Sequence, residues 1–145
     1  MIRNSQFAIA LHILTLLAQA NQEALTSEYI ASSVNTNPVF IRRVLGKLAR
    51  AGLTTSQPGV GGGWQLLRSP DYITLLDAYG AVEDERLLSL HHSPPNAQCP
   101  VGRNIQRSLL QYFGEAEQAF TQTLAQHTVA QLLHAVIQDA QDTSA

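Results

Sequence analysis

The chain has 145 residues, enough for one domain or one small domain with an appendage, and 45% of them are hydrophobic, as in a globular protein with a buried core. No run of about 18 apolar residues occurs, so no membrane-spanning helix is expected. The net charge of −2 is unevenly distributed, because residues 29–69 hold five basic residues and no acidic one, while all eleven acidic residues lie elsewhere. Such a basic segment is typical of a surface that binds nucleic acid, although a solvated basic surface without a partner shows the same pattern.

The first two predicted elements are short amphipathic helices. Residues 4–20 repeat apolar side chains at helical spacing. Residues 27–34 predict a second helix, which Thr26 or Ser27 can cap. Glu28 lies in its first turn, where the helix dipole favours a negative charge.

The third predicted helix has an apolar side and a cationic side. Asn37 followed by Pro38 is typical of a helix start, and Gly52 is typical of a helix end. The cationic side carries Arg42, Arg43, Lys47 and Arg50. Because this helix follows a short helix and a polar turn, the pair predicts a helix-turn-helix motif, whose second helix enters the major groove of DNA.

The glycine-rich stretch that follows, QPGVGGGWQLLR at residues 57–68, fits either a phosphate-binding loop or the tip of a β-hairpin. A nucleotide-binding loop needs Lys and then Ser or Thr after its last glycine, but Trp64 and Gln65 stand there. The dinucleotide pattern would need a glycine in place of Trp64. A β-branched run precedes the stretch, so we expect a hairpin, the wing of a winged helix.

The C-terminal part is predicted to be helical. A short helix follows Pro70, residues 84–98 form a loop by their prolines and polar residues, and a long helix with an apolar stripe starts near residue 99. A helix of that length has no evident partner in so small a chain, so we expect it to pack against its copy in a homodimer. The predicted fold class is mainly α with a small β-hairpin. The predicted divisions are a winged helix-turn-helix DNA-binding domain at 1–82, a linker at 83–98 and a helical dimerisation region at 99–145.

Three segments carry a resemblance to a known family. Residues 37–53 (NPVFIRRVLGKLARAGL), 59–68 (GVGGGWQLLR) and 73–83 (ITLLDAYGAVE) are similar to the Rrf2 family of bacterial transcription regulators. The resemblance implies a cytoplasmic homodimer that binds double-stranded DNA at a palindromic operator, as a repressor. It leaves open whether Arg42 and Arg43 read bases or clamp phosphates. The DNA-binding residues that it implies are Thr36, Asn37, Val39, Arg42, Arg43, Lys47, Gly61, Gly62 and Gly63.

The resemblance also bears on cofactors. Cluster-binding members of the family use three closely spaced cysteines before the long helix, and this chain has one cysteine, Cys99. An iron–sulfur centre needs about four ligands, and adding His91 and His92 gives three at most, with unfavourable spacing. We therefore expect no iron–sulfur cluster and no metal site. Two interpretations of Cys99 stay open: a regulatory thiol at a helix start, where oxidation is favoured, or a small buried packing residue.

Two other classes of function are to be compared with this one. A winged-helix module that binds another protein, and not DNA, is the principal alternative. An enzyme is disfavoured, because no Ser/His/Asp, Cys/His or paired-carboxylate set is suggested by the spacing. The sequence therefore predicts a DNA-binding transcription regulator without catalytic activity.

Overall fold

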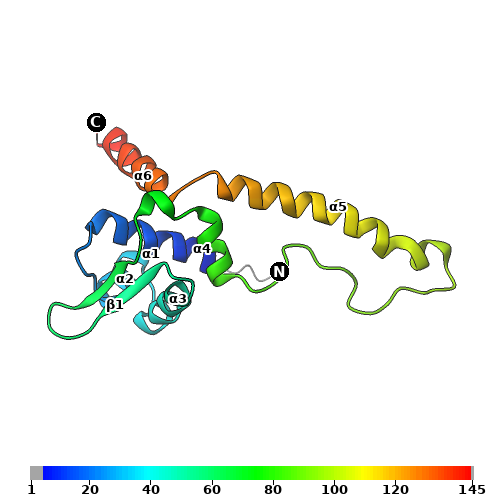
Figure 1. Ribbon diagram of the computed structural model, residues 1–145, viewed down its shortest axis with the longest axis horizontal. Helices are drawn as coiled ribbons and strands as arrows, with labels where there is room; N and C mark the ends of the chain where they lie inside the picture. Colours follow the sequence, from blue (N-terminus) through cyan, green and yellow to red (C-terminus); the bar gives the residue numbers. More distant parts are fainter. Residues whose placement is uncertain (1–4, 145) are drawn as a thin grey trace. The chain divides into compact units, whose positions relative to one another are not determined.

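The computed structural model describes residues 5–144 and is mainly helical, with a two-stranded antiparallel sheet (Figure 1). This confirms the predicted fold class. The elements in chain order are α1 (Gln6–Ala20), α2 (Ser27–Val34), α3 (Pro38–Arg50), β1 (Thr54–Gln57), β2 (Gly63–Leu66), the 3₁₀ helix η1 (Pro70–Tyr72), α4 (Leu75–Val82), α5 (Pro100–Ala125) and α6 (Val129–Thr143). The described residues form two compact units, one made of 5–84 with 125–144 and the other of 85–124.

One apolar cluster fills the first unit. It draws side chains from α1, α2, α3, α4 and α6, and from the segments between them. Its buried members are Ala10, Ile13, Leu14, Leu17, Ile30, Ala31, Ile41, Val44, Leu45, Leu48, Leu53, Ile73, Ala78, Val82 and Val129. Burying one such Leu, Ile or Val side chain stabilises a fold by about 1.5–3 kcal/mol, so this cluster holds the three N-terminal helices in fixed positions.

The turn between α2 and α3 is fixed by caps at both helices. Asn35 takes the left-handed conformation (φ 63°) that ends α2, and the N–H of Thr36 donates to Ala31 O at 3.0 Å. The side chain of Asn37 then caps α3, where Oδ1 accepts from Val39 N at 2.7 Å. Pro38 occupies the first helical position, where its missing N–H costs no hydrogen bond. The predicted helix-turn-helix motif is therefore present.

The hairpin that follows α3 has a short glycine-rich loop between its strands. β1 and β2 pair antiparallel, with Thr54 opposite Leu66 and Gln57 opposite Gly63. A bridge between Leu25 and Trp64 ties the hairpin to the segment between α1 and α2. The two hydrogen bonds of this bridge, Trp64 N to Leu25 O at 2.7 Å and Leu25 N to Trp64 O at 3.0 Å, hold the base of the wing against the helical unit.

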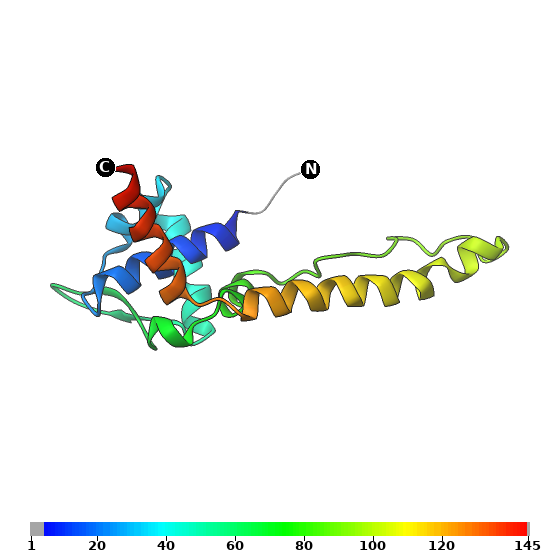
Figure 2. The same cartoon turned by 90° about the horizontal axis from the view of Figure 1, so that it is seen from above.

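Helix α6 packs on the first unit, in contrast to the domain division expected from the sequence, which grouped it with the long helix. Val129 is fully buried in the core, and α6 lies beside α1 (Figures 1 and 2). The segment before α6 pairs with the segment before α4, through Val129 N to Ile73 O at 2.8 Å and Leu75 N to His127 O at 2.9 Å. These backbone bonds join distant parts of the chain, and local sequence patterns carry no signal for them.

In the second unit, residues 85–98 run beside α5 without regular structure. Leu88 and Leu90 of this segment line a small cleft together with Leu110 and Phe113 of α5. Helix α5 has 26 residues, and none of them is buried. Its apolar side chains are therefore only partly covered by the chain itself.

Among the described residues, no helix is both long enough and apolar enough to cross a membrane.

Candidate nucleic-acid interface

The outer face of α3 combines positive charge with two small or apolar positions. Ile41, Val44, Leu45 and Leu48 turn to the core, which leaves Val39, Arg42, Arg43, Gly46 and Arg50 on the other side at helical spacing. Because the buried stripe fixes the rotation of α3, it also fixes which side chains face outward. We call the five outward residues the reading face.

Arg42 is held by the neighbouring helix. Its Nη1 donates to Ser27 Oγ at 2.9 Å and to Glu28 Oε1 at 3.2 Å, both in the first turn of α2. Both hydrogens of that nitrogen are therefore used within the chain. If Arg42 contacts DNA, as the sequence predicts, it must do so through its other guanidinium nitrogens. Its hydrogen bonds to Ser27 and Glu28 also hold α3 against α2.

The pKa of the Glu28 carboxyl is lowered from its ordinary value. The largest cause is a hydrogen bond from its own backbone N–H; the positive charge of Arg42 and the hydrogen bonds from Ser27 and Arg42 act in the same direction, and burial opposes them. Glu28 therefore keeps its charge to lower pH than an isolated glutamate does. Glu28 lies one residue before the basic segment in sequence, and its ion pair with Arg42 partly neutralises the predicted basic surface.

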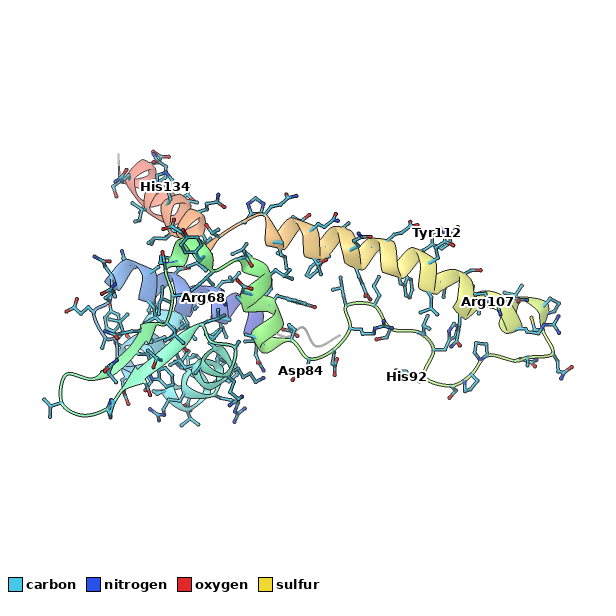
Figure 3. All side chains as sticks on the ribbon, viewed as in Figure 1. Arg68, Asp84, His92, Arg107, Tyr112 and His134 are labelled. Atoms are coloured by element: carbon cyan, nitrogen blue, oxygen red, sulfur yellow. The ribbon has the colours of Figure 1, made fainter. Side chains whose placement is uncertain are left out.

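Arg43 and Arg50 are the exposed cations of the reading face with no hydrogen-bond or ion-pair partner among residues 5–144. Lys47, one turn from Arg43, is half-buried, and its Nζ donates to Gln6 Oε1 at 2.8 Å. Arg68 reaches Tyr72 O at 3.3 Å and Asp77 Oδ2 at 3.9 Å (Figure 3). Of the five basic residues in the predicted basic segment, Arg43 and Arg50 thus offer the most available charge.

The N-terminal end of α3 places three of the predicted residues. Asn37 and Val39 are exposed, and Thr36 is half-buried in the turn. The Oδ1 atom of Asn37 is used as the helix cap, so only its amide N–H₂ group is available to an outside acceptor. A bidentate contact from Asn37 to adenine would therefore require loss of the cap.

The sequence predicts that Gly61, Gly62 and Gly63 of the wing contact DNA. In the structure, two of these glycines are required by close contacts within the protein. A side chain at Gly63 (φ 149°) would come within 2.5 Å of Leu25 O, and one at Gly62 within 2.0 Å of Gln57 O. Gly62 is therefore needed for the hairpin loop to close, and Gly63 is needed for the hairpin to pair with the segment that carries Leu25. Gly61 has a positive φ of 77° with open space around it, so it is the predicted wing residue that lies free at the tip.

Cys99 lies immediately before α5 and is exposed. Its carbonyl accepts from Arg103 N at 2.9 Å, the first hydrogen bond of the helix. Within the single chain the Cys99 side chain is exposed at a helix start. Both interpretations of Cys99, a regulatory thiol and a residue that packs the start of the dimer helix, therefore stay open.

The candidate ligands for an iron–sulfur cluster are few and lie in or next to the segment before α5. Within residues 5–144 no group of three or more His, Cys, Asp or Glu side chains converges. Cys99 is the one cysteine of the sequence, and His91 and His92 are exposed in the segment before α5. A cluster needs about four ligands, which a single chain of this composition does not bring together.

Two features of the interface were missed by sequence reasoning. The first is the tie from Arg42 to Ser27 and Glu28, for which the only signal was Glu28 in the first turn of the helix before the turn. The second is Gly46, a glycine inside a helix, where it costs about 0.5–1 kcal/mol relative to alanine. Packing within the chain does not explain the glycine, because a side chain there would meet only Arg50 Nη1, at 3.6 Å.

Comparison with known proteins places the chain among transcription regulators. The model of the Rrf2 family, described as an iron-dependent transcriptional regulator, matches residues 3–135. YwnA of Bacillus subtilis (strain 168), provisionally named an HTH-type transcriptional regulator, is 40% identical over 131 residues, which cover 90% of this chain and 96% of that protein.

Solved structures agree in fold. The crystal structure of a provisionally assigned DNA-binding protein is 35% identical, with a TM-score of 0.72 over 89% of this chain and 99% of that one. CymR (YrzC), the global cysteine regulator of B. subtilis, is 20% identical, with a TM-score of 0.70 over 93% and 98% of the two chains. At that identity the second likeness concerns the fold alone.

Proposed function

The chain belongs to the Rrf2 family of DNA-binding transcriptional regulators, and we propose that it is a homodimer that binds a palindromic operator and represses transcription. The observation that carries the proposal is the reading face, on which Arg43 and Arg50 are exposed without a partner among the described residues. A cationic helix face of this kind, on the second helix of a helix-turn-helix, matches the major groove of DNA. A dimer bound over a promoter represses by excluding the polymerase, so no catalytic step is involved.

In the proposed complex α3 enters the major groove with the end that carries Asn37 leading. Arg43 lies nearly two turns further along and reaches base edges or flanking phosphates, and Arg50 reaches the phosphate backbone. The tip of the wing around Gly61 comes next to the minor groove, where its backbone N–H groups approach phosphates without a side chain between. Thr36 and Lys47 support the edges of the contact.

The homodimer rests on α5. Its 26 residues span roughly 39 Å at the rise of an α-helix, and yet none is buried within the chain. Leu109 belongs to its apolar stripe, and Tyr112 is exposed and projects away from the segment that carries His92 (Figure 3). A second copy of α5 would cover this surface, and the two-fold symmetry of such a dimer would match the two halves of a palindrome.

We further propose that DNA binding needs no iron–sulfur cluster and that the protein works in the cytoplasm, where its DNA partner lies. Regulation would act through Cys99, whose thiol is exposed. Oxidation by diamide, which takes up the two electrons and two protons released, would join two Cys99 thiols across the dimer or join Cys99 to a small thiol. A change of operator affinity on diamide treatment, absent in Cys99→Ser, would support this; equal affinity before and after would remove the thiol from the proposal.

The DNA-binding proposal is tested by fluorescence anisotropy with duplexes from the region upstream of the protein's own gene and with duplexes selected from a random pool. We expect binding whose logarithmic affinity falls linearly with the logarithm of salt concentration, because phosphate contacts release counterions. Arg43→Ala should weaken binding, whereas Arg107→Ala, which removes an exposed arginine from α5, is the charge-matched control. Absence of salt-sensitive binding to any duplex would favour the alternative, a winged-helix module that binds protein.

The dimer is tested by sedimentation of Leu109→Asp, which puts a charge on the apolar stripe. Ser108→Asp adds the same charge at an exposed neighbouring position and serves as the control. We expect the first variant to sediment as a monomer and the second as a dimer, because an unpaired charge buried in an apolar interface costs several kcal/mol. A dimeric Leu109→Asp would place the interface elsewhere.

Repression is tested by a transcription assay from a promoter that contains the selected site. Wild-type protein should lower the transcript yield; a rise would make the protein an activator.

A further inference from the structure

Val39 is an apolar residue on the exposed, positively charged face of α3. Its side chain is 58% exposed at the start of α3, and among the described residues of that helix it is the one large apolar side chain that is exposed. It lies one turn before Arg42 and Arg43, on the same face. The remaining apolar residues of α3 are buried or half-buried against the core, so packing within the chain does not account for Val39.

The position of Val39 is tightly fixed. Its backbone N–H donates to the capping oxygen of Asn37 at 2.7 Å, and Pro38 before it locks the first helical residue. A β-branched side chain on a helix has essentially one χ1 rotamer. The two methyl groups of Val39 therefore project from α3 in one direction, ready to meet a partner without loss of side-chain freedom.

Gly46 lets α3 approach its partner closely. It lies two turns after Val39 on the reading face, and a side chain there would meet only the end of Arg50, at 3.6 Å. The chain itself thus leaves room for a side chain and lacks one. A helix that is bare at this point can lie deeper in a groove, which brings the residues around it within reach of base edges.

We propose that Val39 reads the C5-methyl group of a thymine in each half of the operator; this inference rests on the proposed function. In the major groove the other base edges present hydrogen-bond donors and acceptors, whereas thymine also presents a methyl group. A valine placed against a polar edge would leave that edge without a hydrogen bond, which is unfavourable. Val39 therefore selects thymine both by apolar contact with its methyl group and by exclusion of the other bases.

The test uses full-length protein and a duplex selected by the wild-type chain from a random pool. Each thymine of this duplex is replaced in turn by deoxyuridine, which lacks only the C5-methyl group, and affinity is measured by fluorescence anisotropy. For wild-type protein we expect a loss of about fourfold at one thymine in each half-site, the change for one methyl group withdrawn from water. Val39→Ala should bind the thymine and deoxyuridine duplexes equally at that position.

Two further variants make the result specific. Val39→Thr keeps the shape and one methyl group, so it should retain part of the discrimination. Val60→Ala removes the same atoms from the exposed wing tip and should leave the ratio between thymine and deoxyuridine unchanged, because the thymine methyl lies in the major groove. Val39 is exposed and alanine favours helices more than valine does, so Val39→Ala should fold, which circular dichroism would verify.

The outcomes separate this inference from the function beneath it. If wild-type protein binds the selected duplex but no deoxyuridine substitution matters, or if the loss persists in Val39→Ala, the assignment of Val39 is overturned while DNA binding stands. If no duplex is selected or bound at all, the proposed function fails and this inference fails with it.

Discussion

The two units of the chain differ in how completely they bury their own apolar side chains. In the first unit, the side chains of five helices close on one buried cluster, and backbone bonds tie α6 to the segment before α4. In the second unit, a 26-residue amphipathic helix has no buried residue. Surfaces that the chain covers by itself stabilise the fold, and we propose that the apolar groups left uncovered on α5 and the charges left uncovered on α3 bind partners.

The same contrast occurs at smaller scale inside the first unit. Arg42 is tied to Ser27 and Glu28, while its neighbour Arg43 has no partner among the described residues. Gly63 is required by the approach of a backbone carbonyl, while a side chain at Gly46 would meet only the end of the Arg50 side chain, at 3.6 Å. In each pair, one residue is engaged by contacts within the protein and the other is available for contact with DNA. Matched substitutions of the two residues test this difference.

The largest effect is expected from the same substitution made in both units. Leu48 of α3 is fully buried, and Leu110 of α5 is 48% exposed. Leu48→Ala should lower the free energy of unfolding by about 2–5 kcal/mol, because it leaves a cavity in a closed core. Leu110→Ala should cost less than about 1 kcal/mol in chemical denaturation at concentrations where the protein is monomeric. Equal losses would mean that α5 is as well packed in the single chain as the core is.

The next contrast concerns the wing. Gly63→Ala should destabilise the fold by about 3 kcal/mol, the upper end of the cost of backbone strain, since the new methyl group would meet the carbonyl of Leu25. Gly61→Ala also has a positive φ but no close neighbour, so about 1 kcal/mol is expected. Thermal unfolding of the two variants measures the difference. If Gly61→Ala proved the more harmful, the strain would lie at the tip of the wing and not at its base.

The third contrast separates the two arginines by DNA affinity. Arg43→Ala should weaken binding to the selected duplex by about 1–3 kcal/mol if Arg43 reads a base, with relaxed preference at one position. Arg42→Ala should weaken binding to all duplexes alike, because its ties to α2 position the helices and leave fewer nitrogens for bases. An unchanged binding isotherm for Arg43→Ala would remove that residue from the interface.

Much of the fold could be predicted from the sequence because its signals are local. The caps at Thr26 and Asn37, the proline at the start of α3 and the glycine-rich loop each act within a few residues, and the structure contains the elements they indicate. The place of α6 could not be predicted in this way. It depends on Val129 entering a core built by residues more than forty positions earlier, and on hydrogen bonds that pair Val129 with Ile73.

The sequence was sufficient to predict a cationic face on α3, but not which of its side chains are engaged by contacts within the protein. A cationic helix face follows from the spacing of Arg43, Lys47 and Arg50. Which of these cations is already engaged depends on side chains from other helices, such as Gln6 with Lys47, and sequence spacing does not show such contacts. The wing glycines illustrate the same limit, because the composition GVGGG indicates backbone freedom without saying whether the protein or the DNA uses it.

A smaller effect is expected at Gly46, where stability and binding should change in opposite directions. Gly46→Ala should raise the free energy of unfolding by about 0.5–1 kcal/mol, because alanine is the better helix former and the space is open. The same methyl group should weaken DNA binding if α3 lies close against the groove at this point. Denaturation and anisotropy on one preparation measure both quantities. Tighter or equal DNA binding would show that Gly46 does not face the duplex.

The smallest effect is the pH dependence of the tie between Glu28 and Arg42. The pKa of Glu28 is lowered in the folded chain, chiefly by its own backbone N–H and then by Arg42 and Ser27. The unfolded chain therefore binds more protons than the folded chain in the acidic range, so stability rises with pH there. The contribution should be complete above the ordinary pKa of a glutamate and should disappear as pH falls through the lowered value.

Glu28→Gln removes this titration and keeps the size of the side chain. The difference in unfolding free energy between wild-type protein and Glu28→Gln should therefore shrink as the pH is lowered through the acidic range, in a series of urea titrations. A difference that stays constant with pH would mean that Glu28 does not hold Arg42 by its charge. Arg42 would then be held by its hydrogen bond to Ser27 Oγ and not by the Glu28 charge, and the difference between Arg42 and Arg43 would be smaller.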